Sequence, residues 1–210
     1  MKNKRLFIAI NFLYVIIPLL ILLFPKLFQY KFHILVIFGI IIYFLMRTIG
    51  ISNAELGITK QNTLKSLMTN LPLIVVAIFI ILLMRLLNLN KFIPNESLYF
   101  YLFYIFISCP IQEFLYRGVY GYFDNGKKGI LLLSCFMYSF VHIIYKDLFT
   151  NILTFIIGLI WFSLYQKDKN LVGVSISHCI LGILTIFLGI VDWKCILNWN
   201  YLSIILWYFL

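Results

Sequence analysis

Long apolar segments, separated by short segments that hold most of the charged residues, constrain the fold of this chain more than any other feature. Of its 210 residues, 63% are hydrophobic and 11% are charged, whereas soluble proteins carry about 25% charged residues. The apolar segments reach the roughly 20 residues that a helix needs to cross a bilayer. The sequence therefore predicts an all-α fold, a polytopic membrane bundle of about eight transmembrane helices. They are expected at residues 6–25, 32–49, 67–87, 98–121, 129–146, 148–165, 171–190 and 196–210.

The segments between the predicted helices are short, so residues 1–210 are expected to form a single integral membrane domain. Lys and Arg are more frequent in the loops on the side of the N-terminus than in the opposite loops. The positive-inside rule then predicts a multi-pass protein of the cell membrane with both termini in the cytoplasm. The net charge of +10 is spread over these loops instead of one face, so no nucleic-acid partner is expected.

One acidic residue, Glu113, lies within a predicted transmembrane helix, whereas the others lie between apolar segments or at their ends. An ionised carboxylate in hydrocarbon is costly, so an acidic residue there indicates a functional site with a nearby partner. Arg117 is the nearest candidate, because residues four apart share one face of a helix. A purely structural ion pair would have the same spacing.

Two of the three histidines, His142 and His178, also lie within predicted transmembrane helices. A polar ring in that environment needs a hydrogen-bonding partner to offset its lost hydration. His33 instead begins the second predicted helix, and we expect it at the membrane interface. With a rise of about 1.5 Å per residue, Glu113, His142 and His178 are compatible with one pocket nearer the cytoplasmic face.

The spacing of these residues resembles the three motifs of the CAAX protease and bacteriocin-processing family, abbreviated CPBP and also called Abi. The family motifs read E-E-x-x-x-R, F-x-x-x-H and H-x-x-x-N. The corresponding stretches here are Gln112-Glu113-x-x-x-Arg117, Tyr138-x-x-x-His142 and His178-x-x-x-Gly182. Residues 55–58 (Glu-Leu-Gly-Ile) also resemble an L-G-L segment of the family, so the resemblance covers residues 55–190.

The resemblance implies a membrane-embedded endopeptidase that activates a water molecule. In the family, the first glutamate and the first histidine activate the water, and the second histidine and the asparagine stabilise the oxyanion. Carried over by position, the predicted catalytic residues are Glu113, His142 and His178, with Arg117, Tyr138, Gln112 and Gly182 in support. The chain departs from the motifs at Gln112 and Gly182, where the family has glutamate and asparagine. Because a neutral amide is no general base, Glu113 would have to take over.

Two functions remain open at this stage. An active enzyme would cleave a peptide or protein substrate near the cytoplasmic membrane face, with membrane lipids around it. A weak or inactive family member would act as a bacteriocin-immunity or envelope accessory binding protein, and the two departures favour this alternative. The abundance of Ile, Phe, Lys and Asn is typical of AT-rich bacterial genomes, which favours bacterial peptide substrates.

The sequence establishes no cofactor. Glu113, His142 and His178 could supply three zinc ligands and leave an open position for water, as catalytic zinc sites do. The chain contains no H-E-x-x-H sequence or other compact metal-binding motif, so zinc is the secondary expectation.

Overall fold

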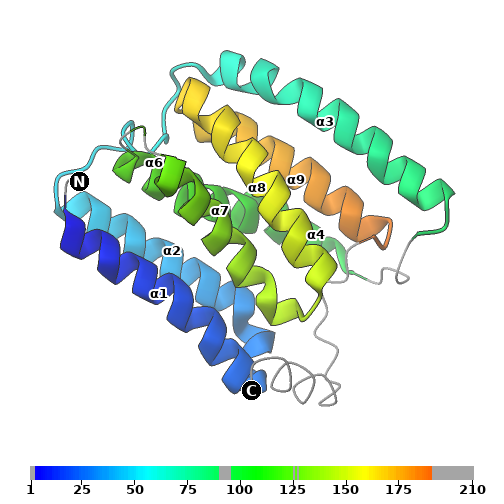
Figure 1. Cartoon of the computed structure of the whole chain (residues 1–210), viewed down its shortest axis with the longest axis horizontal. Helices are drawn as coiled ribbons and strands as arrows, with labels where there is room; N and C mark the ends of the chain where they lie inside the picture. Colours follow the sequence, from blue (N-terminus) through cyan, green and yellow to red (C-terminus); the bar gives the residue numbers. More distant parts are fainter. Residues whose placement is uncertain (1–2, 90–95, 125, 127, 191–210) are drawn as a thin grey trace.

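The computed structural model describes residues 3–89, 96–124, 126 and 128–190. Every regular element in these ranges is helical, as the apolar pattern predicts (Figure 1). The first part of the chain forms α1 (Lys4–Leu23), η1 (Pro25–Tyr30), α2 (Lys31–Thr48) and α3 (Thr63–Leu86). The central part forms α4 (Leu98–Phe103), η2 (Tyr104–Ser108), α5 (Cys109–Glu113), η3 (Phe114–Val119) and α6 (Tyr120–Phe123). The last part forms α7 (Lys128–Val141), η4 (His142–Tyr145), α8 (Leu148–Asp168) and α9 (Leu171–Phe187).

Each predicted transmembrane helix up to residue 190 has a helix in its place, and the prediction for 196–210 lies outside the described residues. Two of these helices are apolar but shorter than a full span: Gly129–Tyr145 and Leu171–Phe187. Five are long and apolar enough to cross a membrane: Lys4–Leu23, Pro25–Thr48, Thr63–Leu86, Leu98–Phe123 and Leu148–Asp168. The predicted multi-helix membrane architecture is confirmed, whereas the count of eight is not.

The helices are arranged so that α5 and η3 lie inside the bundle. Figure 1 shows α1 and α2 together on one side and α3 on the other, with α7, α8 and α9 between them. α3 packs mainly against α9, and α7 packs mainly against α8. α5 contacts both α2 and α9, so the turn that holds Glu113 can meet side chains from several helices.

The central helix, residues 98–123, contains two π-helical turns, η2 and η3, on either side of Pro110. Proline lacks an N–H group and its ring clashes with the carbonyl one turn earlier, so the sequence predicts a distortion here. The helix accommodates Pro110 with the wide turn η2, which ends just before it. Wide π turns are frequent at functional sites, and all six residues of η3 are buried.

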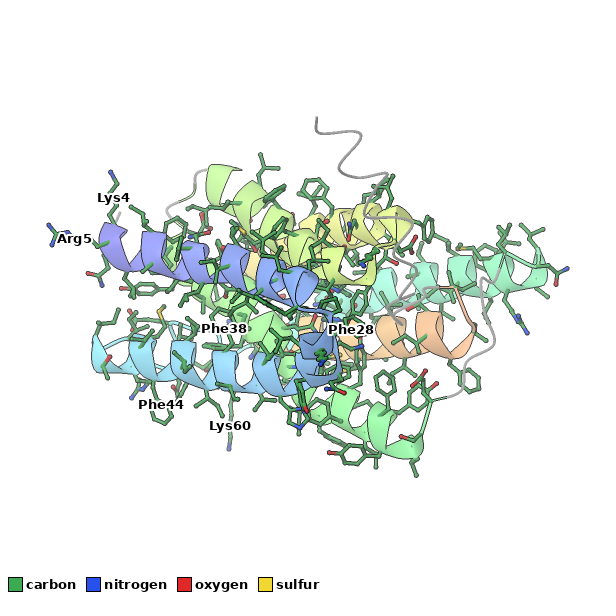
Figure 2. The ribbon with its side chains drawn as sticks, turned by 90° about the horizontal axis from the view of Figure 1, so that it is seen from below. Lys4, Arg5, Phe28, Phe38, Phe44 and Lys60 are labelled. Atoms are coloured by element: carbon green, nitrogen blue, oxygen red, sulfur yellow. The ribbon has the colours of Figure 1, made fainter. Side chains whose placement is uncertain are left out.

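The outer faces of the helices are apolar and exposed, as surfaces that meet lipid should be. Figure 2 shows the contrast on α2, where Phe38 points inward toward α1 and Phe44 points away from the bundle. Their exposed fractions are 8% and 61%. Lys4 and Arg5 lie at the start of α1 and point away from the bundle (Figure 2), where charged groups reach the membrane interface.

The loop before α3 holds the start of α9 in position. The backbone N–H of Leu171 donates to the carbonyl oxygen of Gly57 at 3.0 Å. The buried Asn170 side chain donates to the carbonyl oxygens of Thr59 and Gln61, at 2.8 and 2.7 Å. These bonds tie the two loops together at the end of the bundle where α9 begins, seven residues before His178 along the chain.

α3 and α9 approach each other so closely that only glycine fits at residue 173. The N–H of Gly173 donates to Ser66 Oγ at 3.2 Å. A Cβ atom on Gly173 would overlap the backbone carbonyl of Ser66, which cannot move without shifting α3. Gly173 therefore sets the distance between the two helices that also enclose the cavity described below.

We expect Gly173→Ala to lower the free energy of unfolding by about 1–3 kcal/mol, because the added methyl group forces α3 and α9 apart. Unfolding in mixed detergent micelles with increasing SDS measures the change. Gly129→Ala is the matched control, since a Cβ there meets nothing within 4 Å. Equal stability of both variants and the wild type would contradict the close contact.

Candidate active site

The predicted pair of Glu113 and Arg117 is present and buried. Arg117 Nε lies 3.2 Å from Glu113 Oε2, and the side chains are 1% and 0% exposed. The guanidinium carbon lies 4.2 Å from the centre of the Tyr138 ring and 5.3 Å from that of Trp161. Within the described residues, no guanidinium N–H group makes a well-aligned hydrogen bond. The charge of Arg117 is therefore balanced by one carboxylate and two aromatic faces.

His178, on α9, lies at the centre of the polar cluster. Its Nδ1 lies 2.7 Å from Glu113 Oε1, and its Nε2 lies 3.3 Å from the Tyr138 hydroxyl. Trp161 stacks on the imidazole with 4.7 Å between the ring centres, and its Nε1 donates to Ser177 Oγ. An ionised carboxylate only accepts hydrogen bonds, so the imidazole proton lies on Nδ1 and is donated to Glu113. Nε2 then accepts a hydrogen bond from the Tyr138 hydroxyl. Tyr138, His178 and Glu113 thus form one hydrogen-bonded chain.

His142 lies where α7 tightens into the 3-10 turn η4. Its Nδ1 is 2.7 Å from the carbonyl oxygen of Tyr138, one turn earlier. A carbonyl oxygen only accepts, so Nδ1 carries the proton and Nε2 keeps its lone pair. The imidazole also meets the Tyr138 ring edge-on, with 4.9 Å between the ring centres. His142 is therefore held in the form that can accept a proton at Nε2.

A cavity of about 350 Å³ lies beside these residues, enclosed mainly by α3, α8 and α9. Both histidines line it, so the structure brings His142 and His178 to one space, as predicted. Its polar lining includes Tyr104, Gln112, Tyr138, His142 and His178. Neither Glu113 nor Arg117 lines this cavity, because both are buried behind the Tyr138–His178 layer.

Gln112, and not Glu113, faces the cavity. Successive helical residues point about 100° apart, so the two cannot share one direction. The Gln112 side-chain N–H donates to Ser108 Oγ at 2.9 Å. Gly182 also lines the cavity, and a side chain there would overlap the Tyr104 hydroxyl. Both departures from the family motifs therefore lie in the cavity wall.

The arrangement of donors does not fit the zinc expectation. Among the residues that the structure describes, no three His, Cys, Asp or Glu side chains are positioned to hold one metal ion. Glu113 directs Oε1 to His178 Nδ1 and lies outside the cavity that His142 and His178 line. A metal bound by all three would require that hydrogen bond to break, so no step below uses a metal.

The comparisons with known proteins match one part of the chain to a protein family. Residues 94–184 match the family model described as Rce1-like, a type II CAAX prenyl endopeptidase. All the motif residues, from Gln112 to Gly182, lie within the match. This region is similar to the Rce1-like family. The resemblance to the CPBP family is thereby confirmed for the Rce1-like region, and residues 55–58 lie before it. No curated protein and no solved structure is significantly similar to the chain.

At the level of the family, the Rce1-like region supports an intramembrane endopeptidase, and the apolar helices make the protein a multi-pass membrane protein. The sequence analysis missed three residues of the Rce1-like region that shape the site. Ser108 and Tyr104 precede Gln112 by four and eight residues, a spacing that puts them on one side of a helix. That signal was available. No sequence pattern indicated Trp161, because its contact with His178 depends on how α8 and α9 pack.

Proposed function

We propose that the protein is an intramembrane endopeptidase that hydrolyses a peptide bond in the cavity between α3, α8 and α9, near the cytoplasmic membrane face. One observation carries the proposal. Within the Rce1-like region, His142, whose Nδ1 is engaged by the Tyr138 carbonyl oxygen, lines the same cavity as the hydrogen-bonded Tyr138 and His178. A proton acceptor and a proton donor that share one cavity are what water-mediated peptide hydrolysis requires.

The proposed reaction uses His142 as the general base. His142 Nε2 takes a proton from water while the water oxygen bonds to the scissile carbonyl carbon. The Tyr138 hydroxyl, which donates to His178 Nε2 in the resting site, turns its proton to the carbonyl oxygen and stabilises the developing negative charge. His142 then returns the proton to the leaving nitrogen as the C–N bond breaks. Glu113 touches no substrate in this scheme and acts as a positioning residue that orients His178.

The cavity favours a substrate with an apolar chain. Apart from the polar residues named above and three threonines, it is lined by aliphatic and aromatic side chains. On α3, Val76 and Ile80 line it and remain 57% and 50% exposed, and on α8 the same holds for Ile156 at 50%. Side chains that line the cavity and are also exposed on the surface mark a side opening of the cavity toward lipid. An apolar peptide or an attached lipid could enter through this opening.

We expect Gln112→Glu to raise the turnover number by about 10²–10⁴-fold, because a carboxylate facing the cavity beside His142 adds a second general base. The assay reconstitutes the protein in liposomes with a farnesylated CAAX-type reporter peptide and measures the cleaved product. Gln61→Glu adds the same charge on an exposed loop and is the control. Absence of cleavage by both the wild type and Gln112→Glu would overturn the proposed enzyme.

The second candidate function is a binding protein for bacteriocin immunity or the cell envelope. The amide of Gln112 in the cavity wall favours it, since the strongest general base of the motif is missing there. The test expresses the protein in bacteria and measures their survival in the presence of a bacteriocin. Protection that survives in His142→Ala and His178→Ala at equal protein abundance supports binding, and protection lost in both supports catalysis.

A further inference from the structure

The hydroxyl of Tyr104 lies where a side chain on residue 182 would otherwise be. A Cβ atom on Gly182 would overlap the Tyr104 hydroxyl oxygen and two carbons of its ring. Both residues line the cavity. The absence of a side chain at Gly182 thus admits a phenol from the central helix into the wall formed by α9.

This position is next to His178. Gly182 follows His178 by four residues on α9, one turn further along the same face. The Tyr104 ring stands edge-on to the His178 imidazole, with 6.0 Å between their centres and 80° between their planes. Tyr138 approaches the same imidazole from α7, with 5.8 Å between the ring centres. His178 therefore has a tyrosine on each of two neighbouring elements.

Packing holds the Tyr104 ring but leaves its hydroxyl weakly engaged. Its ring lies against that of Phe100, with 5.9 Å between the centres. The thiol of Cys109 is among the groups near the hydroxyl, and a thiol is a weak hydrogen-bonding partner. A donor that is rigidly held and weakly bound can turn to a stronger acceptor at little cost, which is the property of an oxyanion donor.

We propose that the Tyr104 hydroxyl is a second oxyanion donor of this site, occupying the space that Gly182 leaves open. The inference rests on the proposed endopeptidase function. As the water oxygen bonds to the carbonyl carbon, the C=O double bond becomes a C–O⁻ single bond, and the proton of the water goes to His142. Tyr104 donates a hydrogen bond to that O⁻ and keeps its proton throughout. When the C–N bond breaks and C=O re-forms, the hydrogen bond to Tyr104 weakens again.

The first test is Tyr104→Phe, assayed in liposomes with the farnesylated reporter peptide. Losing one oxyanion donor should lower kcat by about 10²–10³-fold and leave KM unchanged, because the bond forms only in the transition state. A purely space-filling tyrosine would be replaced by phenylalanine without loss. Tyr99→Phe is the control, since that tyrosine lies on α4 and is 74% exposed.

The outcomes separate the two proposals. An active wild type with an unchanged kcat in Tyr104→Phe overturns the role of Tyr104 and leaves the endopeptidase intact. A wild type and a Gln112→Glu variant that both fail to cleave overturn the endopeptidase, and the role of Tyr104 with it. A loss confined to KM also contradicts the inference, because it would mark a contact with the substrate ground state.

A second test moves the donor to the other helix. Gly182→Asn alone should impair folding, because its side chain overlaps Tyr104. Tyr104→Ala removes the obstacle, and asparagine then brings a short N–H donor to the same point. We expect Tyr104→Ala/Gly182→Asn to recover at least about tenfold of the kcat that Tyr104→Ala loses. A double variant no faster than Tyr104→Ala would show that a donor at this position does not assist the reaction.

Discussion

Replacing Glu113 with alanine is expected to lower the free energy of unfolding by about 3–5 kcal/mol, the usual cost of removing one partner of a buried ion pair. Arg117 is 1% exposed, so its charge would remain in the bundle without a counter-charge. His178 would lose the acceptor of its Nδ1 proton as well. SDS unfolding in mixed micelles measures the change, and proteolysis should be lost together with stability.

A double variant distinguishes the ion pair from packing. Glu113→Leu/Arg117→Met removes both charges and fills a similar volume with apolar groups. Buried ion pairs replaced in this way are often as stable as the original, so the double variant should regain most of the stability lost in Glu113→Ala. If it is as unstable as Glu113→Ala, the pair is not what stabilises this turn.

His142→Ala is expected to lower kcat by about 10²–10⁴-fold, the contribution of a general base, while the protein keeps nearly its full stability. Among the described residues, the side chain makes one hydrogen bond, to the Tyr138 carbonyl, and it belongs to no buried charge pair. Cleavage of the reporter peptide and SDS unfolding measure the two effects on one sample. His33→Ala is the matched control, because His33 is exposed and lies on α2. Cleavage at the wild-type rate would exclude His142 as the base.

The spacing of residues within one helix predicted part of the site correctly. Glu113 and Arg117 are four residues apart and form the expected pair, because helical geometry alone brings such residues together. The histidines were selected because polar rings are costly in an apolar segment, and both line one cavity. These predictions needed only local geometry and the cost of burying polar groups.

The roles of neighbouring residues could not be predicted in the same way. The sequence favoured Glu113 as the group that activates water, yet Glu113 bonds to His178 behind the cavity and Gln112 faces it. Which of two adjacent residues faces a cavity depends on the rotation of the whole helix. Here that rotation includes two π turns, η2 and η3, which local propensity does not predict.

The sequence by itself determined that this chain is a bundle of membrane helices with a polar site built from His142, His178 and the turn around Glu113. Apolar length and the cost of isolated charge in lipid are sufficient for that conclusion. Only the tertiary structure decided that Glu113 supports His178, that Gln112 faces the cavity, and that Tyr104 fills the space beside Gly182. Contacts between separate helices depend on their rotation, tilt and closeness, which are properties of the packed bundle and of no single segment.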